Sequence, residues 1–583
     1  MIRKVFRHTM VTQIVSSMTV MICMLVDSMM IGRFLGVDSM TAYGLAMPVL
    51  LVFAAFGSML SAGVQVMCGK AMGSGSKDGM DACYTVSVVL TIAFSGVGLL
   101  ALLVFLGPIC TMLGAGPAEP SNEIFRLTKD YIRGFVIGAP AFLFAQIMVP
   151  FLQFSGQQTR VVVGVGAMTV SDILFDILNV FVFRGGTFGM GLASSLSYYI
   201  SFAVGVLFFV KPSCMFRLRF RLVDKKTCSS VLKYGVPTVI NQICMVLLVF
   251  VLNNILLEVG QSRAVASYSV ISTIGNICYC VGSGIGSVAL MLASLFYTDE
   301  DRTSLYDLIR TMMRYTVILN LALTVVVLLA APILVPLFLT DASAKSMAIL
   351  GMRLFCLSLL PSALNAAFKS YFQGVNRLFF SEAISVMQNF VFTSLFAFIL
   401  SRFLGTTGVW LCFLCGETLT FLVICAAAWI RHRSVTLDPT AFSFLQNDFG
   451  VKEGDYIEMS VRSAEESVAA SRKAEAFCLE HGESERNSSM IALCVEEMTE
   501  NIVRHGFPKD KNENMIDIRL IFKNGQKVIR IRDNCVSFDP LKYLELHETD
   551  DPTKHFGIRM VMKMVKNADF VYSLGMNNLT LVL

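Results

Sequence analysis

The sequence predicts a polytopic α-helical membrane protein of about twelve spans, arranged as two six-helix bundles and followed by a C-terminal α+β domain. Of its 583 residues, 55% are hydrophobic and only 15% charged, which is too apolar for an ordinary soluble protein. Apolar runs of about 20 residues, long enough to cross a bilayer, recur along most of the chain. Charged residues return at the density of a soluble protein from Val451 onward.

The apolar runs define the predicted spans in order. They cover residues 11–33, 44–72, 84–108, 130–154, 161–183, 189–211, 235–258, 265–296, 315–339, 347–372, 380–401 and 407–430. We therefore expect a membrane half over residues 1–433, a linker over 434–450 and a separate domain over 451–583. The first bundle is expected at about 1–212 and the second bundle at about 213–433.

Positive charges predict the orientation of these spans. Lysine and arginine gather in alternate loops, and short loops of that kind stay in the cytoplasm. The segments rich in lysine and arginine are residues 2–8, 70–77, 211–233, 302–314 and 429–433. We expect a multi-pass protein of the plasma membrane with both termini in the cytoplasm. The net charge of +5 reflects these loops and does not argue for a nucleic-acid partner.

The two halves of the membrane region repeat one another. "TAYGLAMPVLLVF" (41–53) resembles "ASYSVISTIGNIC" (266–278), and "VPFLQFSGQQTR" (149–160) resembles "KSYFQGVNRLFF" (369–380). Six spans separate the matched segments. Because that number is even, the repeat is parallel, as in some secondary transporters.

Acidic residues inside the first bundle are candidates for function. Asp27 interrupts an apolar run, and "SDILFDILN" places Asp172, Asp176 and Asn179 at i, i+4 and i+7 on one helical stripe. A carboxylate at the bilayer centre costs roughly 2.5–3.5 kcal/mol on insertion scales, so such a residue should face a cavity or a partner. Three converging carboxylates cannot all stay ionised without cations, which suits uptake and release of H⁺ or Na⁺. The alternative is that Asp27 is solvated at the outer interface while the span-5 acids cap the helix or pair with Arg160.

The membrane half resembles the multidrug and toxic compound extrusion (MATE) transporters over about residues 10–430. The resemblance rests on "VDSMMIGRFLGVDSMTAYGLAMPVLLVFAAFGSMLSAGVQVMCGKAMGSG" and on "YGVPTVINQ". It implies that Asp27 and Asp176 couple transport to H⁺ or Na⁺. Asp172 stands where relatives often carry Asn, and Ser194 or Ser195 matches a family Thr or Ser that lines the site.

The second bundle contains fewer acidic residues that could bind a coupling ion. Its first span has no acid before Glu258, so the coupling is expected in the first bundle. Glu417 looks isolated in the last span, where we expect a structural or cavity-facing role.

The residues after 450 predict alternating helices and antiparallel strands. A strand is followed by a helix that opens on a capping box of Ser463 and Glu466. "IALCVEEMTENIVRHG" is amphipathic at helical spacing, and "MIDIRLIFKNGQKVIRIRD" reads as two strands joined by an Asn524-Gly525 turn. A last helix opens at Gly557. Such a pattern is typical of an α+β sandwich.

This domain carries residues suited to a Mg²⁺–nucleotide site. Glu497, Asn501 and His505 stand at i, i+4 and i+8 on one helix, and Asp533 ends a strand. The site needs an oxygen ligand for the metal, an acid, and helix-terminal amides for phosphate. A solvated helix face would show the same polarity.

The domain also resembles the GHKL (Bergerat-fold) ATPases, closest to anti-sigma-factor serine kinases, through "EEMTENIVRHGF…IRDNCVSFDP…FGIRMV". The resemblance implies ATP and Mg²⁺ as cofactors, Glu497 as general base, Asn501 as Mg²⁺ ligand and Asp533 as the adenine-reading acid. Gly557 would bind the nucleotide, and residues 541–556 would form a lid. Cys535 and Ser537 depart from the family, which usually has glycine at both positions.

Together these features favour an ion-coupled exporter of organic cations or amphiphilic drugs with a cytosolic ATP-binding regulatory domain. One alternative is a membrane-tethered serine kinase or anti-sigma-like switch, which would act on a cytosolic regulatory protein. Another is a flippase of lipid-linked precursors, which favours extra spans and cationic residues inside the cavity; the sequence suggests neither. The expected partners are a small-molecule substrate and membrane lipid.

Overall fold

The computed structural model describes most of the chain. The described residues are 2–115, 122–209, 214–339, 341–432, 439–446, 449–452, 454–507, 514–523, 525–547 and 556–583. Within them, eleven helices are long and apolar enough to cross a membrane. A twelfth span is formed if Ala342–Cys356 and Leu359–Gly374, which are bent by 47°, count as one. The expectation of about twelve spans is confirmed.

Six helices form the first bundle. They are α1 (Ile2–Met30), α2 (Val37–Gly73), α3 (Lys77–Met112), α4 (Glu123–Phe154), α5 (Gln158–Leu178) and α6 (Gly186–Phe209). Both α1 and α5 end in a π-helical turn, over Ile31–Leu35 and Asn179–Phe183. The helix α1 carries Asp27, and α5 carries the acidic stripe predicted from the sequence.

The second bundle begins with the long helix α7. It contains two spans, Lys225–Gln261 and Arg263–Thr298, because Gln261 leaves the helical conformation at φ 54°. The remaining helices are α8 (Arg302–Leu334), α9 (Ala342–Cys356), α10 (Leu359–Gly374), α11 (Leu378–Val386), α12 (Phe392–Leu404) and α13 (Thr406–His432). A π-helical turn, Met387–Val391, joins α11 to α12 as one span.

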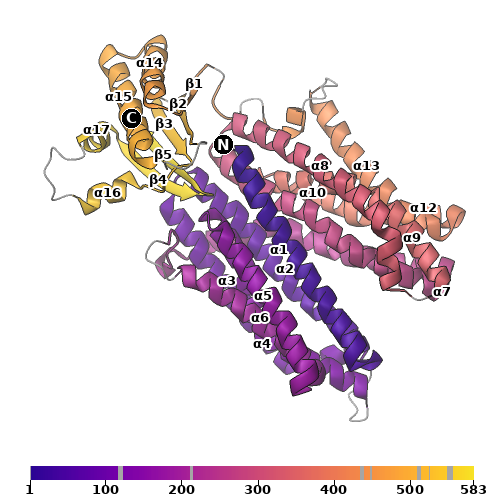
Figure 1. The fold of residues 1–583 in the computed structure, drawn as a ribbon. Coiled ribbons are helices and arrows are strands. Elements are labelled where there is room, and N and C mark those ends of the chain that lie inside the picture. Colours follow the sequence, from indigo (N-terminus) through magenta and orange to yellow (C-terminus); the bar gives the residue numbers. More distant parts are fainter. Residues whose placement is uncertain are drawn as a thin grey trace.

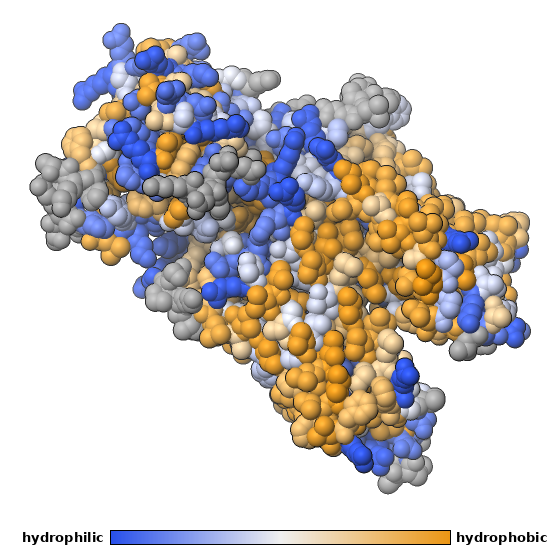
Figure 2. All heavy atoms as spheres, viewed as in Figure 1, coloured by the Kyte–Doolittle hydropathy of each residue, from blue (hydrophilic) through white to orange (hydrophobic). Residues whose placement is uncertain are grey.

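The two bundles meet at one end and diverge at the other (Figure 1). We call the end beside the C-terminal domain the tail end and the opposite end the far end. At the tail end, Gln13 Nε2 donates to Ser287 Oγ at 2.7 Å, and Ser287 Oγ donates to Gln65 Oε1 at 3.2 Å. The Lys70 ammonium lies 3.8 Å from the ring centre of Tyr234 across the same junction. On the face that Figure 2 shows, apolar side chains cover much of both bundles, as a lipid environment requires.

The C-terminal domain is one antiparallel sheet of order β1-β2-β3-β5-β4. Its strands are β1 (Tyr456–Val461), β2 (Ile516–Lys523), β3 (Gln526–Asp533), β4 (Asn567–Ser573) and β5 (Met576–Val582). Its helices are α14 (Ala464–Glu480), α15 (Glu485–Asn501), α16 (Pro540–Leu546) and α17 (Phe556–Met564). The helices α14, α15 and α17 pack on one face through buried apolar residues of alternate strand positions. The predicted α+β class is confirmed.

Several local predictions are met within this domain, with differences in detail. Ser463 caps α14, since its Oγ accepts from Glu466 N at 3.2 Å, but the Glu466 carboxylate binds Arg462 N rather than the cap residue. Gly525 has φ 75°, as a hairpin turn requires, whereas Asn524 lies outside the described residues. The strands β4 and β5 were not predicted.

The segment expected as a linker is partly packed against the second bundle. Pro439–Ser443 forms a 3₁₀ turn, and Phe444 and Leu445 are buried. Tyr371 Oη donates to Ser443 O at 3.1 Å, which ties this segment to α10. Residues 433–438 and 447–448 lie outside the described residues.

Candidate functional site

Three carboxylates converge inside the first bundle, and we call them the acid pocket. Asp27 comes from α1, and Asp172 and Asp176 come from successive turns of α5, which packs along α1. Their exposed fractions are 8%, 3% and 0%. The three side chains interact electrostatically with one another. The helical spacing of α5 thus places Asp172 beside Asp176, and the packing of α1 on α5 brings Asp27 to them.

The acid pocket leaves several carboxylate oxygens without a donor. Among the described residues, none donates a hydrogen bond to Asp27 Oδ1, Asp172 Oδ1 or either carboxylate oxygen of Asp176. Burying an ionised oxygen without a partner is costly, so the pocket is suited to taking up a proton. The alternative pairing with Arg160 is absent from the described contacts: Arg160 Nε donates to Gln157 Oε1 at 3.1 Å, and its guanidinium stacks over Phe208.

Serines of α6 line the pocket beside Asp172. Ser194 and Ser197 both adjoin that carboxylate, and Ser197 Oγ donates to Ser194 O at 2.7 Å. Ser195 instead holds α6 against α4, because its Oγ donates to Gly134 O at 2.7 Å and accepts from Gly138 N at 2.9 Å. Of the two serines weighed from the sequence, Ser194 is therefore the one at the pocket.

Asn179 follows Asp176 on the stripe that the sequence predicted, because its backbone N–H still donates to Phe175 O and Asp176 O. Its side-chain amide, however, bonds to the turn that follows α5. Its side-chain oxygen accepts from Gly185 N at 3.1 Å, and its Nδ2 donates to Gly186 O at 3.1 Å. The Asn179 amide is thus engaged by the turn between α5 and α6.

The structure adds residues to the pocket that the sequence did not single out. Tyr43, Tyr131 and Tyr198 all interact electrostatically with the acids, and the rings of Tyr43 and Tyr131 meet edge to face with centroids 5.3 Å apart. Cys23, one turn before Asp27, donates to Thr169 Oγ1 at 3.2 Å. Because Cys23 stands four residues before Asp27 on the same helix, its place at the pocket could have been predicted from the sequence. No such spacing marks the three tyrosines.

A second polar network lies in the second bundle and corrects two expectations. Glu417 is not isolated: its carboxylate accepts from Asn365 Nδ2 at 2.9 Å and from Gln388 Nε2 at 3.2 Å. Lys369 is a cation inside a predicted span, whereas the sequence suggested no cationic residue inside the cavity, and its Nζ donates to Asn241 Oδ1 at 2.6 Å. These bonds join α7, α10, α13 and the π-helical turn of residues 387–391.

The nucleotide-site candidates of the C-terminal domain gather where α15 meets α17. A side chain added at Gly557 would place its Cβ 2.1 Å from Glu497 Oε2 and 3.8 Å from Asn501 Nδ2. These three residues are therefore close neighbours. His505 is exposed and lies in the π-helical turn Ile502–Gly506, so it leaves the face shared by Glu497 and Asn501.

Asp533 ends β3 on the same side of the sheet and is 3% exposed. Its Oδ1 accepts from Asn577 Nδ2 at 2.7 Å and from Cys535 N at 3.0 Å. Burial raises the pKa of the Asp533 carboxyl, and the hydrogen bond from Asn577 opposes this. The Cys535 side chain is buried and its Cβ approaches Gly506.

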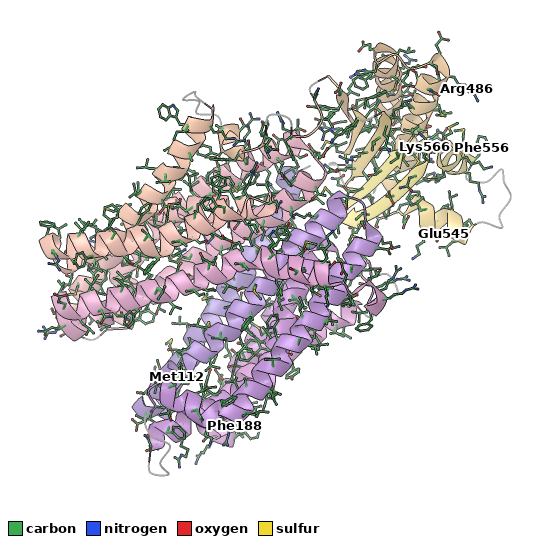
Figure 3. The ribbon with its side chains drawn as sticks, turned by 180° about the vertical axis from the view of Figure 1, so that it is seen from behind. Met112, Phe188, Arg486, Glu545, Phe556 and Lys566 are labelled. Carbon is green, nitrogen blue, oxygen red and sulfur yellow. The ribbon has the colours of Figure 1, made fainter. Side chains whose placement is uncertain are left out.

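The donor set fits Mg²⁺–ATP better than a free metal. In the described chain, no group of three or more His, Cys, Asp and Glu residues is placed to hold a metal ion. A carboxylate and an amide oxygen beside a helix N-terminus suit a magnesium ion whose other ligands are phosphates and water. Of the expected lid, α16 and Phe556 are described, and residues 548–555 lie outside the described residues (Figure 3).

Fold and site together define a multi-pass membrane transporter joined to an ATPase-like domain, and comparison with known families agrees. The MatE family model matches residues 13–178 and 237–399, more than half of the sequence. The chain belongs to the MatE family. Residues 461–583 match the histidine kinase-like ATPase domain.

Curated relatives and solved structures match the membrane half. Multidrug export protein MepA of Staphylococcus aureus is 22% identical over 438 residues, which cover 75% of this chain and 95% of MepA. The MepA of Staphylococcus saprophyticus is 21% identical over 435 residues, covering 74% and 94%.

Two solved structures show the same fold. A crystal structure of MATE in complex with MaL6 superposes with a TM-score of 0.70 at 20% identity, covering 76% of this chain and 98% of that one. A mutant of the Vibrio cholerae MATE transporter VcmN gives a TM-score of 0.69 at 16% identity, with the same coverage.

Proposed function

We propose that this protein exports organic cations or related amphiphilic compounds in exchange for H⁺ or Na⁺ bound at the acid pocket. The observation that carries the proposal is the set of orphaned carboxylate oxygens on Asp27, Asp172 and Asp176. A cation that fills the pocket offsets the repulsion between these acids, and its release restores that repulsion. Ion binding thereby changes how closely α1 and α5 can pack, which couples the ion to the shape of the first bundle.

The curated relatives support export as the activity. MepA is named a multidrug export protein, and the match covers 75% of this chain and 95% of MepA. The lysine- and arginine-rich loops lie at the tail end, so the C-terminal domain is on the cytoplasmic side in this proposal. The far end then opens away from the cytoplasm.

For the C-terminal domain we propose regulation by bound ATP and Mg²⁺. Asn501 would hold the Mg²⁺, Asp533 would accept from the adenine amino group, and Gly557 would open a helix toward phosphate. Bound ATP would supply a transferable phosphoryl group, and Glu497 would orient the attacking water or serine hydroxyl. The domain occurs once in the chain and so offers no second ATPase domain within this chain with which to form a motor.

Transport in vesicles tests the exporter proposal. The purified full-length protein is reconstituted, tetraphenylphosphonium is the probe, and a Na⁺ gradient and a pH gradient are imposed separately without nucleotide. We expect one of the two gradients to drive probe movement against its own gradient. Failure of both gradients, with the probe binding normally, would refute ion coupling.

Asn501→Ala is expected to weaken Mg²⁺-dependent ATP binding roughly 10–100-fold, the range for loss of an interaction with a charged group. Glu497→Gln should retain binding and lose phosphoryl transfer, because that carboxylate acts only on the attacking group. The matched control is Glu500→Gln, one residue before Asn501, whose carboxylate pairs with Arg504. Calorimetry on the full-length protein with and without Mg²⁺ distinguishes these cases; equal affinities for parent and Asn501→Ala would exclude the assigned role.

A further inference from the structure

The C-terminal domain presents a basic face to the membrane half. Along β2 and β3, the side chains of Arg519, Lys523, Arg530 and Arg532 occupy the strand positions that alternate with the buried apolar ones. They therefore point away from α14, α15 and α17. We call these four residues the basic face.

The basic face forms ion pairs with an acidic turn of the second bundle, residues 299–301 between α7 and α8. Arg530 Nη1 lies 2.6 Å from Asp299 Oδ1, and Arg532 Nη1 lies 3.1 Å from Asp301 Oδ2. Arg532 also pairs with Asp299, and Lys523 pairs with Glu300. Arg519 Nη1 is 3.0 Å from Asp301 Oδ1, an ion-pair distance without hydrogen-bond geometry.

The ion pairs made by Asp299 and Asp301 are largely shielded from water, whereas Lys523 and Glu300 are partly exposed. Asp299 and Asp301 are 5% and 4% exposed, so salt and solvent screen them less than surface pairs. Burial lowers the pKa of Arg532 to about 10, so the guanidinium stays charged at neutral pH.

The same domain also binds the first bundle. The β4–β5 turn sits on the turn between α4 and α5, where Leu574 N donates to Phe154 O at 2.7 Å. A Cβ at Gly156, which has φ +70°, would lie 3.0 Å from Gly575 N, so only glycine permits this approach. Val571, Leu574 and Met576 join one apolar cluster with residues of both bundles, including Phe6 and Phe296.

One rigid sheet thus spans the tail ends of both bundles, while the far ends stand apart (Figures 1 and 3). Alternating access requires the tail ends to separate so that substrate can enter from that side. The bundles cannot separate there while β2–β3 hold one and the β4–β5 turn holds the other. Undocking from at least one bundle must come first.

We propose that the C-terminal domain is a latch that holds the transporter open at its far end, and that release of the acidic turn from the basic face permits the tail end to open. This deepens the regulatory role proposed above, on which it rests. The strand β3 supplies a route for control, because Arg532 and Asp533 are consecutive residues on opposite faces of the sheet. A nucleotide at Asp533 would act one residue from the ion pairs.

A charge swap tests the latch in the full-length protein. Genetically encoded spin labels at Met112 and Phe403, which lie at the far ends of the two bundles and are 89% and 81% exposed, report their separation. The variant Arg530→Glu/Arg532→Glu repels the acidic turn, and adding Asp299→Arg to it restores opposite charges. Arg504→Glu, on an exposed side chain of the π-helical turn after α15, is the matched control.

We expect long label distances in the parent and the control. The reversal variant should gain a short-distance population by about fivefold, with export under a gradient faster by a similar factor, and the swap should return both toward the parent. Unchanged distances in the reversal variant, or a swap that restores neither distance nor rate, would overturn the latch. If the reversal variant does not fold, Lys523→Glu at a half-exposed position of the same face is measured instead, with the same two outcomes.

Nucleotide separates the latch from the regulatory proposal. If the charge swap behaves as expected but Mg²⁺–ATP changes neither distance nor rate, the latch stands and nucleotide control fails. If Mg²⁺–ATP changes the rate while charge reversal leaves the distances unchanged, regulation stands and the latch fails.

Discussion

Asp27→Asn is expected to lower gradient-driven export by about 100-fold, the upper end of ordinary coupling free energies, while the protein stays folded. Asparagine has the same shape but can neither take up a proton nor offer a full charge to Na⁺. The change also removes one buried charge from the acid pocket, so it should not destabilise the first bundle. Transport under Na⁺ and pH gradients, together with thermal unfolding in detergent, measures both effects.

The control for this experiment is Asp38→Asn, which removes an exposed acid from the first turn of α2 in the same bundle. It should transport at the parent rate. Parent-like export by Asp27→Asn would show that the acid pocket does not couple transport to the ion.

Asp176→Asn should be as damaging as Asp27→Asn, whereas Asp172→Asn should retain most of the activity. Both oxygens of Asp176 are buried without a donor among the described residues, which favours a role for its carboxylate in binding the coupling ion. Asp172 adjoins Ser194 and Ser197, which an asparagine oxygen can also contact. The measurement is the export rate of each variant under the same gradient. If both variants export at the parent rate, the stripe on α5 is structural.

The membrane fold was predictable because bilayer thickness dictates long apolar runs, and six spans separate the repeated segments. Its irregularities were not. The bend between α9 and α10 and the break at Gln261 depend on packing between helices, which leaves no simple periodic signal in one sequence. The strand β5 was missed because Asn577 and Asn578 interrupt its apolar alternation, and β4 was missed because Asn567 and Asp569 make its start polar.

The acids of the pocket could be predicted because a charge within an apolar run is conspicuous and helical spacing is regular. The partners of the Asn179 amide could not be predicted, because Gly185 N and Gly186 O reach it through the fold of the turn between α5 and α6. The tyrosines could not be found, since an aromatic residue in an apolar span usually packs against other helices. The basic face was also hidden, because arginines that alternate with apolar residues look like the solvated side of a sheet, and their partners at 299–301 are more than 200 residues away in sequence.

The most direct test asks which half of the chain energises transport. The chain truncated after Arg433 is reconstituted beside the full-length protein, and export of tetraphenylphosphonium is followed under an imposed Na⁺ or pH gradient with and without Mg²⁺–ATP on the side of the C-terminal domain. Our account predicts that the truncated protein transports under the gradient alone, with an altered rate and no response to ATP. If the truncated protein is inserted and folded yet inactive, and the full-length protein transports only with hydrolysable ATP, the C-terminal domain is the motor and the account is wrong.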